Sequence, residues 1–263
     1  MGRFIAGLDM AAVGSEFQRA DCAPRSTLGD GRLTIIDWVQ AGRYAAGLDP
    51  VVAMGGPSSP VAQSFTKSAP QWQWAANPAT AKVRLMQNAV STDGSLRIEL
   101  EATGAENALA FSLRFDSLRW RFRSVSASDL PADARTYVNS NQPDSVGILL
   151  TLPPGQLFAA GIHQILQLNF VPLSGATATG DEFAFANLPV QCAVASSNAE
   201  LISAEYFIGE QAVTADAGFT PSEPRMRART ESLWPRWNLL ATILELVEPY
   251  FLSGKLNFPP AKR

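Results

Sequence analysis

Histidine is nearly absent from this chain, since His163 is the only one among 263 residues. A Ser-His-Asp hydrolase needs a histidine beside its nucleophile. The sequence also has no Gly-x-Ser-x-Gly turn, no His-Glu-x-x-His helix and no phosphate-binding glycine loop. These absences predict a protein that is not an enzyme. A pair of facing carboxylates, as in a glycosidase, is the one arrangement that they leave open.

Cysteine, net charge and long apolar runs are equally scarce. Cys22 and Cys192 are the only cysteines, which is too few for a disulfide scaffold, so we expect both thiols to be free. The formal net charge of −3 gives no positive field that would attract nucleic acid. No run of eighteen apolar residues occurs, so the sequence predicts no membrane span.

What the chain does contain is a series of oxygen-bearing residues that ends in a carboxylate. An EF-hand loop places oxygen ligands at fixed intervals, with a glycine at its sharp turn, a backbone carbonyl after it and a carboxylate at its end. Asp30, Gly31, the carbonyl of Arg32, Thr34 and Asp37 fall at these intervals. We therefore expect a Ca²⁺ site of weak affinity, on the order of 0.1 to 1 mM.

The beginning of this loop departs from the EF-hand pattern. Ser26 and Leu28 stand where two further oxygen ligands belong, and a leucine side chain cannot bind a cation. One interpretation is an enlarged loop in which Asp21 provides the first carboxylate. Two others are a loop that has lost calcium binding and a plain Asp-Gly turn that caps a helix.

The same stretch resembles one half of a type I dockerin. The resemblance rests on Gly-Asp-Gly-Arg at residues 29–32, Asp-Trp at 37–38, Gly-Arg-Tyr at 42–44 and Ala-Gly-Leu at 46–48. Dockerins consist of two calcium-binding loop–helix repeats that bind cohesin domains in bacterial polysaccharide-degrading assemblies of the cellulosome type. Residues 2–9 repeat residues 42–49 almost letter for letter, so residues 1–49 are interpreted as a partial dockerin-like segment whose first repeat is truncated.

The resemblance also implies a partner surface and a location. A cohesin would bind an apolar patch formed by Ile35, Ile36, Val39 and Tyr44. Proteins of this kind act outside the cell or at its surface. No signal peptide is present, and we expect it to lie upstream of the truncated repeat.

Residues 50–80 are rich in proline, glycine and serine and predict a linker. Trp72 and Trp74 stand two residues apart within it. Two indoles on one side of an extended segment could stack on sugar rings, or they could pack against the following domain.

From residue 81 onward, apolar and polar residues alternate with a period of two. Leu109, Phe111, Leu113 and Phe115, for example, alternate with alanine, serine, arginine and aspartate. Alternation of this kind indicates half-buried strands, and many short strands separated by turns predict a mainly β, antiparallel sandwich. The helical part would then be confined to a small amino-terminal loop–helix module.

Residues 81–214 resemble a cohesin domain, which implies a jelly-roll β-sandwich without catalytic residues. The resemblance rests on the run Leu-Ala-Phe-Ser-Leu-Arg-Phe-Asp at residues 109–116 and on later strands at 160–170 and 197–213. Residues 215–263 are left unassigned, although apolar residues spaced by three and four predict an amphipathic helix at 232–248.

Together, these features predict a non-catalytic extracellular module for assembly or adhesion around polysaccharide breakdown. Its partners would be cohesin or dockerin modules of other proteins. The alternative is a carbohydrate-binding domain in which Trp72, Trp74 or Trp120 forms the stacking surface.

Overall fold

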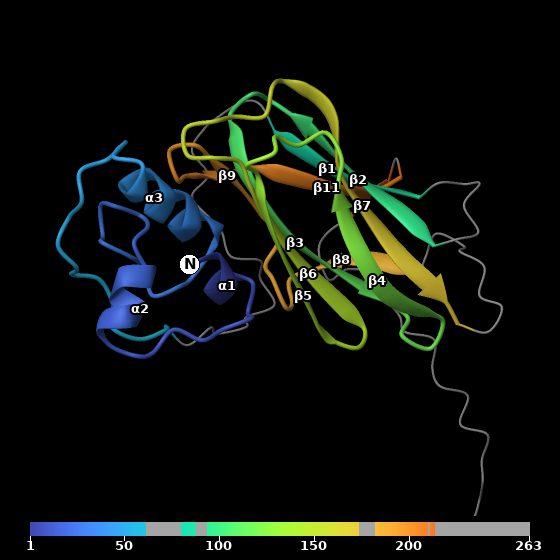
Figure 1. Cartoon of the computed structure of the whole chain (residues 1–263), viewed down its shortest axis with the longest axis horizontal. Helices are drawn as coiled ribbons and strands as arrows, with labels where there is room; N and C mark the ends of the chain where they lie inside the picture. The colour runs from blue at the N-terminus through green and yellow to red at the C-terminus, as the bar shows by residue number, and fades with distance from the viewer. Residues whose placement is uncertain (62–79, 88–93, 174–181, 210, 214–263) are drawn as a thin grey trace, which may run out of the picture. The chain divides into compact units, whose positions relative to one another are not determined.

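Two β-sheets packed face to face form the body of the protein (Figure 1). The computed structural model describes residues 1–61, 80–87, 94–173, 182–209 and 211–213. The predicted mainly β sandwich is confirmed. The tail at 215–263, with its predicted helix at 232–248, lies outside the described residues.

The first sheet, sheet A, has the strand order β12-β11-β1-β2-β7-β4. Its strands are β1 (Ala81–Gln87), β2 (Ser95–Ala102), β4 (Trp120–Ala127), β7 (Gly161–Pro172), β11 (Ala204–Ile208) and β12 (Gln211–Val213). Its neighbouring strands are antiparallel except for β1 and β11, which run parallel. The sequence pattern predicted only antiparallel pairs, because alternation reports which side of a strand is buried and not its direction.

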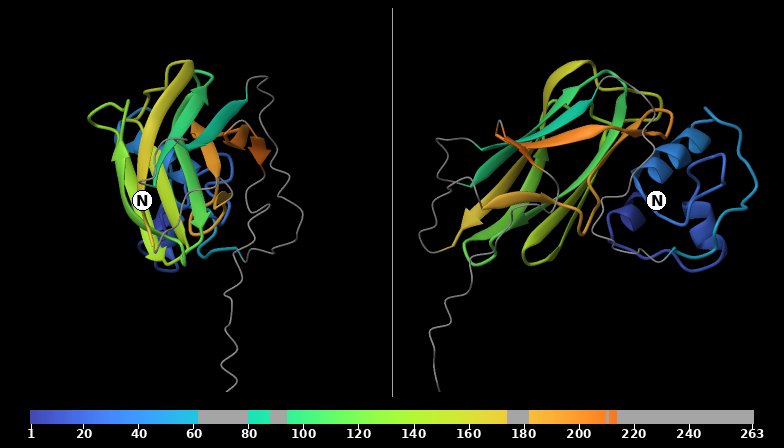
Figure 2. Two further views of the ribbon diagram at one scale, coloured as in Figure 1. Left: turned by 90° about the vertical axis from the view of Figure 1, so that its right-hand side faces the viewer. Right: turned by 180° about the vertical axis from the view of Figure 1, so that it is seen from behind.

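The second sheet, sheet B, has the order β10-β9-β3-β6-β5, and β8 also pairs with β3. Its strands are β3 (Glu106–Phe115), β5 (Arg135–Gln142), β6 (Ser145–Thr151), β8 (Phe183–Ala186), β9 (Ala193–Ser196) and β10 (Leu201–Ile202). The two further views in Figure 2 show both sheets from the side and from behind.

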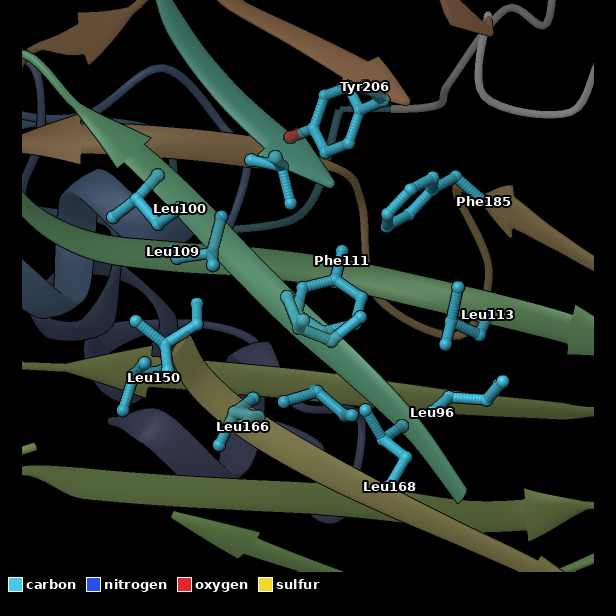
Figure 3. Close-up of a cluster of buried hydrophobic side chains, with 14 of the residues drawn as sticks. Leu96, Leu100, Leu109, Phe111, Leu113, Leu150, Leu166, Leu168, Phe185 and Tyr206 are labelled. Carbon is cyan, nitrogen blue, oxygen red and sulfur yellow. The ribbon is translucent and has the colours of Figure 1, made fainter. Parts of the chain in front are cut away.

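The core lies between the sheets, where the apolar residues of the alternating pattern meet. Leu109, Phe111 and Leu113 of β3 point inward and pack with residues of β7 such as Leu166 and Leu168 (Figure 3). All five side chains are fully buried. The period of two in the sequence thus places one residue of every pair in this core.

The outer faces of the two sheets differ in exposure. In sheet A, β2 alternates between buried and half-buried residues, and β4 is mostly exposed or half-buried. In sheet B, every residue of β6 is buried, and so is every residue of β3 except one. The central strands of sheet B are therefore covered on both sides.

Three short helices precede the sandwich: α1 (Gly2–Ile5), α2 (Ser15–Ala20) and α3 (Ile35–Ala45). Residues 50–61, which the sequence assigned to a linker, return to the segment that carries the helices and bond to the residues that precede α2 and α3. The Val61 N–H donates to the Gly31 carbonyl at 2.9 Å, and the Gly14 N–H donates to the Ser58 carbonyl at 2.7 Å. We call residues 1–61 the N-terminal module. Residues 62–79 lie outside the described part of the chain.

All described residues belong to one compact unit, Met1–Ser222. None of the described helices is long and apolar enough to cross a membrane. Cys22 and Cys192 are not joined in a disulfide, and their Sγ atoms contact the carbonyls of Asp37 and Ala186.

A buried carboxylate holds the turn between β2 and β3. Both oxygens of Glu106, which is fully buried, accept backbone N–H groups of Thr103, Gly104 and Ala105 at 3.0 to 3.1 Å. The Thr103 hydroxyl adds a bond of 2.6 Å.

We predict that Glu106→Ala lowers the free energy of unfolding by about 1.5 to 3 kcal/mol, because several half-buried backbone donors lose a charged acceptor. Urea unfolding followed by circular dichroism measures this change. Glu205→Ala removes an exposed glutamate from the neighbouring sheet and should change the free energy by no more than about 0.5 kcal/mol. Equal effects of the two substitutions would contradict the role given to Glu106.

Candidate functional site

Helix α3 begins at a capping box formed by Thr34 and Asp37. Thr34 has an extended backbone, and its N–H donates to the Asp37 carboxylate at 2.8 Å. Such reciprocal bonds satisfy N–H groups that the first helical turn leaves unpaired. The helix ends before Gly47, whose φ of 69° suits a residue without a side chain.

The sequence repeat of residues 2–9 and 42–49 is also a structural repeat. Arg3 pairs with Asp9, and Arg43 pairs with Asp49, each through two hydrogen bonds of 2.5 to 3.0 Å. In both copies a glycine with a φ of 68° or 69° follows the helix. The two repeats therefore end in the same turn and the same ion pair.

The apolar face of α3 lies on the outer face of sheet B. Ile35, Ile36 and Val39 are 1%, 6% and 4% exposed. Besides Ile5 and Ala23 of the N-terminal module, the residues that they join in one buried cluster are mostly small and come from β3, β6 and β9 and the segments beside β9: Ala108, Ala110, Leu149, Val190, Ala195 and Ala199. We call Ile35, Ile36 and Val39 the module face, and we call Ala108, Ala110, Leu149 and Ala195 the sheet B face.

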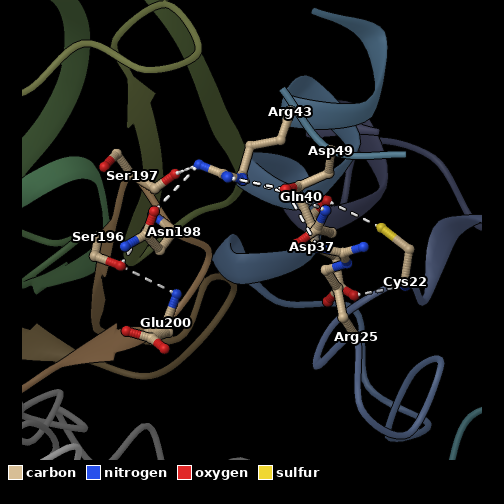
Figure 4. A network of polar contacts seen from close by, with 10 residues as sticks. All are labelled: Cys22, Arg25, Asp37, Gln40, Arg43, Asp49, Ser196, Ser197, Asn198 and Glu200. Atoms are coloured by element: carbon tan, nitrogen blue, oxygen red, sulfur yellow. Dashed lines mark hydrogen bonds and ion pairs between the residues drawn. The ribbon is translucent and has the colours of Figure 1, made fainter. Parts of the chain in front are cut away.

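Polar contacts at the edge fix the position of the module on the sheet (Figure 4). The Arg43 guanidinium, held by Asp49, donates to the Ser197 carbonyl at 2.5 Å and to the Asn198 side-chain oxygen at 3.3 Å. Near the first repeat, the Asn139 amide donates to the Ala6 carbonyl at 2.7 Å. Both repeats are thus bonded to the sandwich.

Aromatic rings and a glycine complete the contact beside β5. The rings of Trp38 and Tyr137 meet edge to face, with centroids 5.2 Å apart. A Cβ atom at Gly2 would lie 2.4 Å from the Tyr137 ring, so this position accepts only glycine without rearrangement. Between α3 and the ends of β5 and β6 there remains a cavity of about 410 Å³, which Trp38 and Arg135 help to line.

These contacts change the interpretation of the predicted partner surface. We expected Ile35, Ile36 and Val39 to be open to a separate protein, and the structure places them against the chain's own sheet. Tyr44, the fourth residue of the predicted patch, is half-buried, and its ring lies 5.9 Å from the Arg25 guanidinium carbon.

The predicted calcium ligands Asp21 and Asp37 are fully buried and bind loop backbone. The Asp37 carboxylate accepts the N–H groups of Cys22 and Ala23 at 2.9 Å, in addition to that of Thr34. The Asp21 carboxylate accepts the N–H groups of the two residues before Arg32, at 3.0 and 2.6 Å. Asp21 therefore lies beside Asp30, and its role as a calcium ligand stays a prediction.

Burial shifts the protonation of all three acidic residues of the loop. It raises the pKa of Asp37 to about 7, although the backbone N–H donors act in the opposite direction. Burial also raises the pKa of Asp21 and of Asp30, and the negative charge of Asp21 further raises the pKa of Asp30 and Asp37. The loop thus brings acidic groups close together where they are shielded from water, and their negative charges repel one another.

Within the described ranges, no group of three or more His, Cys, Asp or Glu residues is arranged to hold a metal ion by itself. Calcium also binds hydroxyl and backbone carbonyl oxygens, and a group made only of His, Cys, Asp and Glu side chains does not include these ligands. The predicted ligands Arg32 and Thr34 belong to that class, and Asp30, which is half-buried, accepts the Arg32 N–H at 3.0 Å.

The tryptophans proposed for sugar stacking do not form a surface in the described residues. Trp120 is 1% exposed and its indole N–H donates to Glu182, so it belongs to the core and the prediction of a stacking role is wrong for it. Trp72 and Trp74 lie outside the described residues. The only histidine, His163, bonds through its Nε2 to the Ala159 carbonyl at 2.7 Å.

Sequence reasoning missed the residues of the sheet B face and their polar neighbours Asn139 and Ser197. One signal was available: Ala108 and Ala110 stand on β3 where a solvent-facing strand usually carries charged or larger polar side chains. Small residues at these positions leave room for another element to approach the sheet closely.

Neither a protein-family model nor a curated protein matches the chain. Among solved structures, it is similar to the sixth cohesin of scaffoldin B from Acetivibrio cellulolyticus, in complex with a Cel5 dockerin, at 14% identity and a TM-score of 0.40, over 52% of this chain and 100% of that one. A non-cellulosomal cohesin from the archaeon Archaeoglobus fulgidus is 7% identical, with a TM-score of 0.39 over 53% of this chain and 94% of that one.

A type III cohesin module from the cell-surface anchoring scaffoldin of Ruminococcus flavefaciens gives 9% identity and a TM-score of 0.37, over 57% of this chain and 97% of that one. At these identities and TM-scores, none of the likenesses assigns a function to this chain.

The shifted pKa values predict how stability depends on pH in the presence of a chelator. The folded chain keeps protons on Asp37, and to a lesser degree on Asp21 and Asp30, at pH values where the unfolded chain has released them. The free energy of unfolding should therefore fall as the pH rises from about 4 to about 7. Arg43 holds the pKa of Asp49 below its ordinary value, so Asp49 changes the free energy of unfolding only at lower pH.

Urea unfolding at pH 5 and pH 7 measures this dependence. Asp37→Asn should show a smaller fall than the unmodified chain, because the amide does not titrate. The interpretation is wrong if both proteins lose the same free energy between the two pH values.

Proposed function

We propose that this chain is a non-catalytic protein–protein assembly module in which the outer face of sheet B receives a loop–helix module. The observation that carries the proposal is the contact between the module face and the sheet B face, which buries both. Branched side chains of α3 meet alanines of β3 and β9, a combination that lets a helix lie close to a sheet.

Burial of the module face provides the main favourable energy of this contact. Burying one Val or Ile side chain stabilises by about 1.5 to 3 kcal/mol before the cost of ordering is subtracted. The module face contributes three such side chains. Arg43 and Asn139 then select one orientation, since each bonds a carbonyl oxygen across the contact.

The resemblance of residues 1–49 to a dockerin and of residues 81–214 to a cohesin supports the same proposal. The partners would be cohesin or dockerin modules of other proteins, in an extracellular or cell-surface assembly for polysaccharide breakdown. A carbohydrate-binding role has less support, because Trp120 is buried in the core.

We also propose that the loop before α3 binds Ca²⁺. The donor set suits calcium, since it combines the carboxylates of Asp21, Asp30 and Asp37 with the Thr34 hydroxyl and the Arg32 carbonyl. Burial, and to a lesser degree the negative charge of Asp21, raises the pKa of Asp30 and Asp37, and a cation would stabilise the charged form of these acids. Calcium would thereby hold the loop in the form that begins α3.

Isothermal titration calorimetry of the full chain tests the calcium proposal. We expect one site with a Kd on the order of 0.1 to 1 mM, which is lost in Asp30→Ala. Asp9→Ala removes an acid of the first repeat, which pairs only with Arg3 among the contacts described above, and should leave binding unchanged. The absence of calcium binding at millimolar concentrations would refute this part of the proposal.

Complementary variants of the full chain test the docking function. Val39→Asp prevents a chain's own module from docking and leaves its sheet B face intact, since an unpaired carboxylate cannot be buried cheaply. Ala110→Asp blocks the sheet B face and leaves the module face intact. An equimolar mixture should form a 1:1 complex, with the intact sheet of one chain bound to the intact module of the other.

Size-exclusion chromatography with light scattering gives the masses, and each variant alone should be a monomer. The matched controls are Val13→Asp, at a position that is 72% exposed, and Ser126→Asp, at an exposed position of β4. Both should behave like the unmodified chain, alone and mixed. If the two docking variants fold, as circular dichroism reports, but form no complex, the proposed function is wrong.

A further inference from the structure

The docking face of this chain is already filled by the chain itself. Ala110 and Leu149 of the sheet B face are 2% and 0% exposed, because α3 covers them. The module face is equally buried. A second module therefore finds no open surface on this chain, and this chain has no open module face to offer.

The contact is specified at both repeats and not only at α3. Arg43 bonds the loop after β9, whereas the equivalent residue of the first repeat, Arg3, is exposed and bonds only its own Asp9 among the contacts of the structure described above. The first repeat uses the Ala6 carbonyl instead, which accepts from Asn139 of β5. The two repeats thus make different bonds near the two opposite edges of sheet B, at β5 and after β9. This is expected if the module docks in one defined arrangement.

A covalent tether gives the chain's own module a large advantage. A short connection corresponds to an effective concentration of about 1 mM. If the contact between separate molecules had a Kd of about 1 µM, the closed form would exceed the open form by about a thousandfold. An external module would then bind about a thousandfold more weakly than it binds an open sheet.

We propose that the protein is self-capped: its own N-terminal module occupies the sheet B face, and other modules bind that face only when the intramolecular contact opens. This inference rests on the proposed docking function, and it adds that the sheet B face is occupied by the chain's own N-terminal module. Removal of the module face from one copy would convert that copy into a receptor for the module of a second copy.

A disulfide across the contact distinguishes binding within one chain from binding between chains. A Cβ atom placed at Gly42 of α3 lies 4.0 Å from the Cβ atom of Pro154, which follows β6. This separation is within the range of about 3.5 to 4.5 Å found in disulfides. Gly42→Cys combined with Pro154→Cys in the full chain should therefore close a disulfide upon mild oxidation.

Self-capping predicts that this disulfide forms within the chain. Non-reducing electrophoresis should show a monomer that migrates faster and reverts with reductant. The two single variants keep Cys22 and Cys192 and serve as controls for bonds to the native thiols. Failure of the double variant to form the bond, or its formation only between chains, would overturn the inference.

The mixing experiment uses one cysteine on each chain. A tagged Gly42→Cys chain and an untagged Pro154→Cys chain, mixed at micromolar concentration, should yield almost no disulfide-linked dimer, because each sheet B face is capped. The same mixture should link efficiently when the first chain also carries Ala110→Asp and the second Val39→Asp, since these changes leave one free module and one free sheet.

The outcomes separate the two proposals. Equal linking in both mixtures would show that the face is open in the unmodified chain, which overturns self-capping but agrees with docking. No linking in either mixture, together with a disulfide inside the double-cysteine chain, would show that the contact exists only within one chain, which overturns the proposed function and with it the inference.

Discussion

The structure depends on the cover that the N-terminal module provides for the outer face of sheet B. A sheet whose two faces are both apolar needs a layer on each side. The inner side of β3 packs against sheet A, and its outer side carries Ala108 and Ala110, which expose apolar surface unless another element lies on them. Helix α3 provides that element, so the sandwich and the module share one buried cluster.

The carboxylates of the acidic loop hold the start of α3 in place. Asp37 begins the helix and at the same time bonds the segment that contains Cys22, while Asp21 bonds the opposite side of the loop. Each carboxylate thus joins backbone segments that are distant in sequence. Their burial raises both pKa values. Under the calcium proposal, a bound cation would offset this cost and so favour the loop form from which the helix begins.

The sandwich and the helix were readable from the sequence because each has a local signature. Alternation over residues 109–115 predicted the side of β3 that enters the core. The repeat of residues 2–9 in residues 42–49 predicted two equivalent helix ends. The role of Asp21 as a calcium ligand did not follow from spacing, because Ser26 and Leu28 interrupt the EF-hand pattern, and it stays a prediction. The parallel pairing of β1 with β11 did not follow, because periodicity carries no information on strand direction or pairing.

The sequence by itself determined which side chains are apolar and with what period, and this is enough to define the strands, the helix and their apolar faces. Only the tertiary structure decided what those faces touch. Ile35, Ile36 and Val39 would form the same stripe whether they met another protein or their own chain. The choice depends on small residues of sheet B and on carbonyls within reach of Arg43 and Asn139. These groups meet only in the folded chain, because the bonded residues are 154 and 133 positions apart in the sequence.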